Sequence, residues 1–363
     1  MRPEDLQTPT LLIDLDAVRH NLATMRHYLD GDLDRWRPHV KTCKVPAVLE
    51  LLLEAGVRRF KVATTRECEV LAATAGGLAI DVLVAMAQHG ANLERTAAIA
   101  AAFPQHRFAM LSEDPAHAAL VRARGLGVFV DLDPGYLRSG VPLRDRDRID
   151  AVAAAAGDRL VGLHCYEGHL HDGTPQERAA ATRAVLAELV ALLRARAEPG
   201  EVVTSGTPTF PIALAYEPLR AFRHTVSPGT VVYWDARSAE LGIEGFACAV
   251  QVQARVIAAP AHDRVTLDAG SKALDAAAGT PCAVALGPWH LRALPPSEEH
   301  LPMVVERGEA PPLGALVRLL PRHVCPTVNL AEDAALLEGG ALLRVVAVRA
   351  RAHEAAPDGA RGE

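Results

Sequence analysis

Between residues 36 and 230 the chain repeats one unit: a short apolar run followed by a longer helical pattern, with a turn residue at each junction. Strands that are joined by helical crossovers run parallel in one sheet. The apolar runs predict eight strands, at residues 36–40, 60–63, 81–84, 107–111, 127–131, 160–164, 201–204 and 224–227. This repeat predicts an α/β fold, a (β/α)8 barrel of the TIM type, with functional groups at the carboxyl ends of the strands.

The pattern changes after residue 230. Later segments alternate β-branched and small residues, which predicts strands at 246–259, 264–267, 283–286, 316–320 and 342–348. A chain of 363 residues is long enough for two packed units. We therefore expect a barrel at residues 1–230 and a mainly β domain at 231–363, against which the N-terminal residues can also pack.

Charge and cysteine content narrow the class of protein. With 38 Lys plus Arg and 44 Asp plus Glu, the formal net charge is -6, which leaves no electrostatic footprint for nucleic acid or an anionic membrane. No apolar run approaches the roughly 18 residues of a membrane-spanning helix, and residues 1–10 lack the pattern of a signal peptide. Six scattered cysteines without a CxxC pair favour reduced thiols, so we expect a cytoplasmic protein.

Lys41 follows the first predicted strand, between Arg37 and Lys44. A lysine at the mouth of a barrel that is partly desolvated and flanked by cations has a lowered pKa, and its amine can form a Schiff base or take up a proton. The alternative is a solvated lysine without chemistry, which is the commoner case for a lone strand-end lysine.

Two turns rich in Gly, Ser and Thr follow the seventh and eighth predicted strands. The first contains Ser205, Gly206 and Thr207, and the second contains Gly229 and Thr230. Barrels often bind a phosphate in these two loops, where backbone N–H groups converge, although ordinary barrel turns are the alternative. A phosphate site together with a Schiff-base lysine is what pyridoxal 5'-phosphate requires, so the two features together predict that cofactor.

A third group of candidates, His323 and Cys325, lies outside the predicted barrel. In an extended segment, residues i and i+2 share one face, so the imidazole and the thiol could hold a divalent metal, with zinc the best match. Two protein ligands leave open coordination positions, which suits catalysis rather than structure. The alternative is a strand with a buried cysteine and a surface histidine.

These segments together resemble one enzyme family. The opening Thr8-Pro9-Thr10 and residues 37–44, 205–209, 227–230 and 323–327 resemble, in matching order, the D-serine dehydratase and D-threonine aldolase family. Its members are fold-type III pyridoxal phosphate enzymes that share a barrel with alanine racemase. The resemblance implies that Lys41 carries the cofactor as a Schiff base. Cys43 stands where relatives commonly have histidine, which puts any role of that histidine in doubt here.

The resemblance also assigns roles to side chains outside these segments. It places Arg138 near the cofactor ring, and Tyr166 and His169 so that they face the cofactor or the substrate. The alternatives without a functional role are a solvated loop arginine for Arg138 and a core phenol for Tyr166. Tyr233 and His300 are second-tier candidates, and a solvated acidic turn is the alternative for the segment around His300.

The implied activity is a lyase reaction on a β-hydroxy D-amino acid. In the family a His-x-Cys pair goes with dehydratases and a His-x-Asp pair with aldolases, so Cys325 favours a D-serine dehydratase-like reaction that yields a 2-oxo acid and ammonia. Its soft thiolate favours zinc over manganese or magnesium. Retro-aldol cleavage of the D-threonine aldolase type, an amino-acid racemase and a non-catalytic cofactor carrier stay open. The family likeness suggests a homodimer.

Overall fold

The computed structural model describes residues 2–197 and 199–355. These residues divide into two compact units, each discontinuous in sequence. The sheet unit contains residues up to 24, 42–48 and 230–352, and the barrel unit contains 25–41, 49–229 and residues from 353 onward. No helix among the described residues is long and apolar enough to span a membrane.

The barrel unit contains a parallel sheet in the strand order β2-β3-β4-β5-β7-β8-β9, with the short β6 paired to β5. Residues 36–39 close the ring through two parallel bridges, from Trp36 to Val226 on β9 and from His39 to Lys61 on β2. The predicted α/β barrel is therefore confirmed, with its first strand reduced to these two bridges. The strands are β2 (Arg59–Val62), β3 (Asp81–Val84), β4 (Arg107–Ser112), β5 (Gly127–Asp133), β6 (Val141–Pro142), β7 (Leu160–Cys165), β8 (Glu201–Thr204) and β9 (Arg223–Val226).

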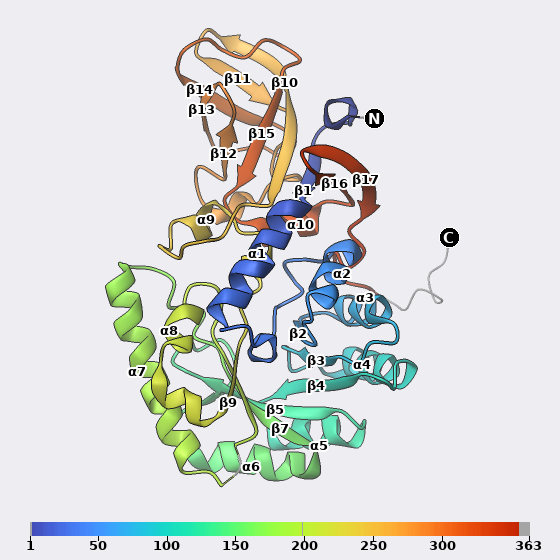
Figure 1. Ribbon diagram of the computed structural model, residues 1–363, viewed down its shortest axis with the longest axis vertical. Coiled ribbons are helices and arrows are strands. Elements are labelled where there is room, and N and C mark those ends of the chain that lie inside the picture. Colours follow the sequence, from blue (N-terminus) through green and yellow to red (C-terminus); the bar gives the residue numbers. More distant parts are fainter. Residues whose placement is uncertain (1, 198, 356–363) are drawn as a thin grey trace. The chain divides into compact units, whose positions relative to one another are not determined.

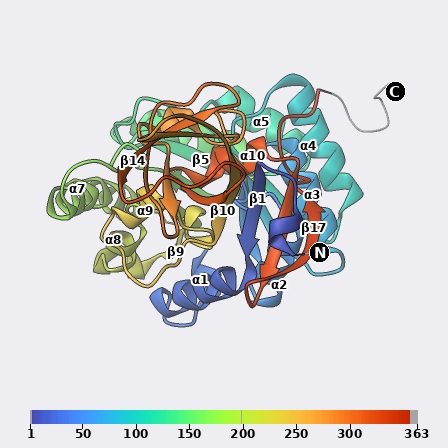
Figure 2. The same cartoon turned by 90° about the horizontal axis from the view of Figure 1, so that it is seen from above.

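Helices cover the outside of these strands (Figure 1, and from above in Figure 2). Several begin at a side chain that accepts a backbone N–H, as Thr64 does for α3, Asp114 for α5 and Thr174 for α7. The helices of this unit are α3 (Thr65–Ala75), α4 (Gly90–Ala102), α5 (Pro115–Ala123), α6 (Arg146–Ala156), α7 (Pro175–Arg194) and α8 (Phe210–Leu214), while α1 (Leu15–Tyr28) and α2 (Pro46–Glu54) each cross the division between the units.

The barrel interior is layered. Leu83, Phe129 and Val203 belong to an apolar layer in its middle. At the amino-terminal side, the fully buried Arg37 guanidinium pairs with Asp81 on β3 and Glu201 on β8, at 2.9 Å each. Arg37 is therefore a neutralised structural ion rather than a cation available to Lys41, which is a correction of the sequence-based expectation.

The sheet unit contains nine strands in the order β11-β14-β13-β12-β15-β10-β1-β16-β17. The N-terminal strand β1 pairs antiparallel with β10 and parallel with β16, which is why residues up to 24 cluster with the C-terminal part. Strands β1, β13, β14 and β16 were not predicted. The elements are β1 (Thr10–Asp14), β10 (Val250–Ala261), β11 (Arg264–Leu267), β12 (Ala283–Leu286), β13 (His290–Ala293), β14 (Leu301–Arg307), β15 (Leu316–Pro321), β16 (Asp333–Glu338), β17 (Ala341–Ala347), α9 (Ala236–Ala239) and α10 (Val324–Leu330).

Candidate active site

Lys41 lies at the carboxyl end of the segment that closes the barrel. The N–H of Val40 donates to the Lys61 carbonyl of β2, and the next side chain, Lys41, is exposed. Its expected cationic neighbours are engaged elsewhere, since Arg37 is ion-paired and the Lys44 ammonium donates to the Ala350 carbonyl. The side chain is therefore placed where a barrel binds its ligand, but in solvent rather than partly desolvated.

The two turns proposed to bind phosphate follow neighbouring strands, β8 and β9, and are joined to each other. The Ser227 N–H donates to the carbonyls of Thr204 and Ser205, at 3.0 and 3.2 Å. Gly206, Thr207 and Gly229 are buried, and none of their N–H groups has an acceptor within the described part of the chain. Buried N–H groups without a partner are rare, so these donors fit a bound anion such as a phosphate.

Glu167, a residue that the sequence analysis did not single out, anchors the first of these turns. Its carboxylate is buried and accepts hydrogen bonds from the Ser205 hydroxyl at 2.6 Å, the Ser205 N–H at 3.3 Å and the Thr209 hydroxyl at 2.7 Å. Both donors of Ser205 are thus directed at Glu167. The remaining free donors of the turn belong to Gly206 and Thr207.

Tyr166 and Arg138 lie together in the barrel unit. The Arg138 guanidinium carbon is 5.0 Å from the centre of the Tyr166 ring and 4.8 Å from that of Tyr136. Gly206 allows Tyr166 to approach the turn after β8, because a Cβ at this position would lie 2.9 Å from the ring. The geometry thus brings together the phenol, the guanidinium and the turn that the resemblance assigned to one cofactor.

His169 stacks on Tyr136, with the ring centres 5.2 Å apart. Its Nδ1 atom is buried and has no hydrogen-bond partner within residues 2–197 and 199–355. A buried polar atom without a partner is expensive unless a ligand or water completes it. His169 therefore fits a position beside a polar ligand.

A second lysine, absent from the sequence-based candidates, lies inside the barrel. Lys61 on β2 is 4% exposed, and its Nζ is 3.4 Å from Nε2 of His164 on β7. Nδ1 of His164 is 2.7 Å from the Asp131 carboxylate on β5. The only sequence signal was charge inside apolar runs: Lys61 stands between Phe60 and Val62.

In the sheet unit, His323 and Cys325 lie at the start of α10. The prediction that His323 and Cys325 lie in an extended segment is wrong. His323, the residue before the helix, has an extended backbone, but Cys325 lies in the first helical turn. The two side chains nevertheless contact each other. The Cys325 sulfur is also 3.1 Å from the Thr42 hydroxyl and 3.7 Å from the Thr230 hydroxyl.

Carboxylates surround this pair. Oδ2 of Asp275 is 3.2 Å from Nδ1 of His323, and Asp235 accepts the N–H of Val324 at the start of α10. Burial lowers the pKa of His323, but the neighbouring Cys325, Asp235 and Asp275 together raise it above its usual value. No group of three metal-ligating side chains occurs in the described residues, so the structure offers an imidazole and a thiol, a donor set that suits zinc.

The second-tier candidates differ in their surroundings. Tyr233 is fully buried, and its hydroxyl donates to the Cys43 carbonyl at 2.8 Å, so it supports the turn that follows Lys41. Burial raises the pKa of this phenol well above its usual value. The His300 side chain is exposed, next to β14, and no hydrogen bond or ion pair reaches its ring in the described structure.

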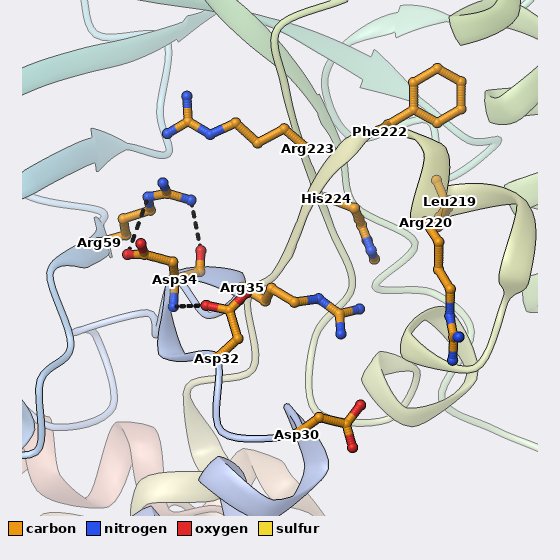
Figure 3. A pocket seen from close by; sticks show the side chains of 10 residues that line it. All are labelled: Asp30, Asp32, Asp34, Arg35, Arg59, Leu219, Arg220, Phe222, Arg223 and His224. Atoms are coloured by element: carbon orange, nitrogen blue, oxygen red, sulfur yellow. Dashed lines mark hydrogen bonds and ion pairs between the residues drawn. The ribbon is translucent and has the colours of Figure 1, made fainter.

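A hollow of about 450 Å³ lies elsewhere in the barrel unit, at the amino ends of the strands, where Arg59 begins β2 and Arg223 begins β9. Figure 3 shows its mixed charges, with Arg59 paired to Asp34. This end of a barrel supports stability, whereas ligands bind at the opposite end. We therefore place the site at the carboxyl ends, where Lys41 and the two turns lie.

Comparison with protein-family models matches both parts of the chain. Residues 13–237 match the alanine racemase N-terminal domain, and residues 249–337 match the serine dehydratase domain. A D-threonine aldolase of Arthrobacter sp is 30% identical over 95% of this chain and 93% of its own length. A D-threo-3-hydroxyaspartate dehydratase of Delftia sp. (strain HT23) is 29% identical over 89% of this chain and 92% of its own.

Solved structures resemble this one over nearly its whole length. The D-threonine aldolase from Filomicrobium marinum has a TM-score of 0.85 at 28% identity, covering 97% of each chain. A Cys-to-Ala mutant of D-threo-3-hydroxyaspartate dehydratase in the metal-free form has a TM-score of 0.79 at 25% identity, covering 98% of this chain and all of that one. The similar enzymes are thus aldolases and dehydratases of β-hydroxy D-amino acids.

Proposed function

Because this chain belongs to the D-serine dehydratase and D-threonine aldolase family of pyridoxal phosphate enzymes, we propose that it is a metal-dependent lyase of β-hydroxy D-amino acids that releases a 2-oxo acid and ammonia. The observation that carries this proposal is the contact of Cys325 with both His323 and Thr42. Thr42 directly follows Lys41 in the chain.

Pyridoxal phosphate, when bound, draws off the electrons of the bond that breaks at Cα of an amino acid. In our proposal Lys41 holds the cofactor, and its Nζ takes up the Cα proton. The N–H groups of Gly206, Thr207 and Gly229 bind the phosphate together with Thr230, which continues the second turn. Arg138 and Tyr166 lie beside the ring. The unpaired buried donors of the two turns support this placement.

A divalent cation, when bound, neutralises the negative charge that develops on the β-oxygen of the substrate. We propose His323 and Cys325 as its protein ligands, with Asp275 fixing the imidazole through Nδ1. The thiolate favours zinc, whereas manganese or magnesium prefer carboxylates. Two protein ligands leave room for the substrate hydroxyl, which suits elimination of hydroxide.

Aldol cleavage is the second candidate, because a named D-threonine aldolase matches 95% of the chain. In that reaction the Cα–Cβ bond breaks, the proton leaves the β-hydroxyl rather than Cα, and glycine and an aldehyde form. The cysteine at 325 favours the dehydratase, because family dehydratases pair histidine with cysteine and family aldolases pair it with aspartate.

Product analysis tests the proposal. The purified protein, loaded with pyridoxal phosphate and zinc, is incubated with D-serine, D-threonine or D-threo-3-hydroxyaspartate, and with L-serine as the control. We expect a 2-oxo acid and ammonia in equal amounts from at least one D-substrate and none from L-serine. Glycine and an aldehyde would establish the aldolase instead. Interconversion of D- and L-amino acids alone, or no turnover, would contradict both lyase reactions.

Borohydride labelling tests the cofactor lysine in the same preparation. The chain has four lysines, Lys41, Lys44, Lys61 and Lys272. Peptide mapping after reduction should find the label on Lys41, and Lys41→Ala should lose the visible absorption band of the bound cofactor. The exposed Lys272 provides a control, because Lys272→Ala should keep the band. A label on another lysine in the wild-type protein would overturn the assignment.

A further inference from the structure

We propose that Lys61, held against His164 and Asp131 inside the barrel, is a positioning residue that sets the charge of the barrel interior next to Tyr166 and the cofactor that Lys41 would hold. This inference rests on the proposed function, since it assigns Lys61 a role toward the cofactor that Lys41 would hold. It goes beyond that function because Lys61 is neither the cofactor lysine nor a metal ligand.

The register of the sheet directs Lys61 into the barrel. Lys61 is paired with Leu83 on β3, and neighbours that are paired in a parallel sheet point to the same face. Leu83 belongs to the apolar layer of the interior. Asp131 and His164 are likewise paired with each other, on β5 and β7, and His164 is paired with Val203 of the same layer. The three polar side chains therefore meet inside the ring of strands.

Hydrogen bonds determine which nitrogen of His164 donates and which accepts. The Asp131 carboxylate, which also accepts the Ser139 hydroxyl at 3.0 Å, can only accept, so Nδ1 of His164 is the protonated nitrogen. Nε2 is then the acceptor for the Lys61 amine. Burial, and next the charge of Lys61, lowers the pKa of His164, which agrees with a neutral imidazole. Asp131 thus selects the tautomer of His164, and Lys61 and Asp131 together hold the ring in one orientation.

Five charged or titratable groups face Lys61, from the strands and loops around it. Burial and the positive charges of Lys41 and Arg138 lower its pKa, while the carboxylates of Asp131 and Glu167 raise it, and the result is a pKa of about 7 instead of 10.5. His164 is the fifth. The Lys61 amine is therefore a buried group whose charge changes near neutral pH.

The consequence extends from Lys61 to the candidate cofactor residues. Its Nζ is 5.4 Å from the centre of the Tyr166 ring, whose other cationic neighbour is Arg138. A charged Lys61 adds a second cation to this ring. A neutral Lys61 removes that cation, so this part of the barrel interior has two charge states.

Two substitutions separate the charge of Lys61 from its bulk. Lys61→Arg keeps a cation at every pH, and Lys61→Met removes it at every pH. We expect the visible band of the wild-type protein, loaded with pyridoxal phosphate, to shift with a midpoint near pH 7. Lys61→Arg should keep the low-pH spectrum and Lys61→Met the high-pH spectrum across the range. Lys272→Met, at an exposed lysine, should keep the wild-type transition. An unchanged transition in both Lys61 variants would overturn the inference.

Asp131→Asn provides a graded test, because the carboxylate raises the pKa of Lys61 and its loss should move the midpoint to lower pH. A midpoint that stays in place or rises would count against Lys61 as the titrating group.

A second readout does not need the cofactor. The unfolded chain binds more protons than the native one between pH 7 and 10.5, so the wild-type melting temperature should rise with pH over that window relative to Lys61→Met. The advantage of the Met variant should be largest below pH 7. If Lys41 failed to bind the cofactor, the proposed function would fail while this readout still reported on Lys61. A pH-independent difference between the two melting curves would refute the titration itself.

Discussion

At the scale of single residues, Asp275 decides which nitrogen of His323 is available. Its Oδ2 occupies Nδ1, so Nε2 is the nitrogen left for a metal. The arrangement is held from two sides, because the Asp275 N–H donates to the Thr327 hydroxyl at 3.3 Å, and that hydroxyl donates to the His323 carbonyl at 2.9 Å. Such carboxylate–histidine pairs orient ligands in metal sites.

We therefore predict that Asp275→Asn weakens zinc binding by about 10- to 100-fold. The amide keeps an acceptor oxygen but carries no charge to support the imidazole. Competition with a chromophoric chelator measures the affinity. The visible band of the cofactor should stay unchanged, and Glu309→Gln, at an exposed position, should leave zinc affinity unchanged.

The prediction for Asp275→Asn requires that the wild-type protein depends on a bound metal. Chelation should abolish turnover and leave the cofactor band in place, because metal and cofactor use different residues. An active preparation that holds no metal and ignores the chelator would refute His323 and Cys325 as ligands and favour the racemase.

Residues also mark the limit of what the sequence could predict. Lys41, His323 and Cys325 could be predicted as site residues because the segments that contain them resemble those of a known enzyme family. Lys61 and Glu167 were not, since one charge in an apolar strand or loop reads as a surface residue until the topology shows that it points inward. The sequence does not show that β2 and β7, which are not neighbours in the sheet, bring Lys61 and His164 together inside the barrel.

At the scale of elements, Glu167 joins the loop after β7 to the turn after β8. We predict that Glu167→Gln lowers the stability of the fold by about 1–3 kcal/mol, because the amide NH₂ cannot accept the donors that the carboxylate satisfies. Affinity for pyridoxal phosphate should fall as the turn loosens. Urea unfolding and cofactor titration measure the two effects. Glu188→Gln, on the exposed side of α7, is the matched control and should change neither.

Arg37 joins the amino ends of the barrel strands. Besides its two ion pairs it donates to the carbonyls of Phe60 and Asp81, at 3.2 Å each. Arg37→Leu should destabilise the fold by about 3–5 kcal/mol, because Glu201 would remain charged and fully buried, with the half-exposed Arg223 at 3.9 Å as its remaining ion-pair partner in the described structure.

Arg107 offers the control for this prediction. It pairs with the same Asp81 at 3.1 Å but is 77% exposed, so Arg107→Leu should cost less than about 1 kcal/mol. Equal losses of unfolding free energy in the two variants, measured by urea unfolding, would show that the buried Arg37 ion pairs stabilise the fold no more than the exposed one of Arg107.

The elements themselves were predicted unevenly, for a physical reason. Parallel strands that are buried on both faces read as continuous apolar runs, and β3 and β8 have the predicted bounds. Strands β13 and β14, which were not predicted, mix exposed and buried positions. His323 and Cys325 are two residues apart, a spacing that fits a strand and also fits the start of a helix. In the structure His323 directly precedes α10 and Cys325 lies in its first turn, so no strand forms there.

At the scale of the whole molecule, a single cut at residue 230 could not describe the two units. Local patterns predict helices and strands but contain no information on which distant strands pair. The sheet unit depends on such a pairing, since β1 joins it across more than 200 positions, with Thr10 paired to Gln253.

The place of β1 has a consequence for the order in which the chain can fold during synthesis. Among the described strands β1 is synthesised first, yet its two neighbours, β10 and β16, follow more than 200 residues later, with Thr10 paired to Gln253 and Leu11 paired to Ala334. Strands β2 to β9 are complete by residue 226, so the barrel can assemble while β1 still waits with both edges open. Its apolar residues Leu12 and Ile13, buried in the finished fold, stay uncovered for that time, which makes β1 a segment that needs protection from aggregation.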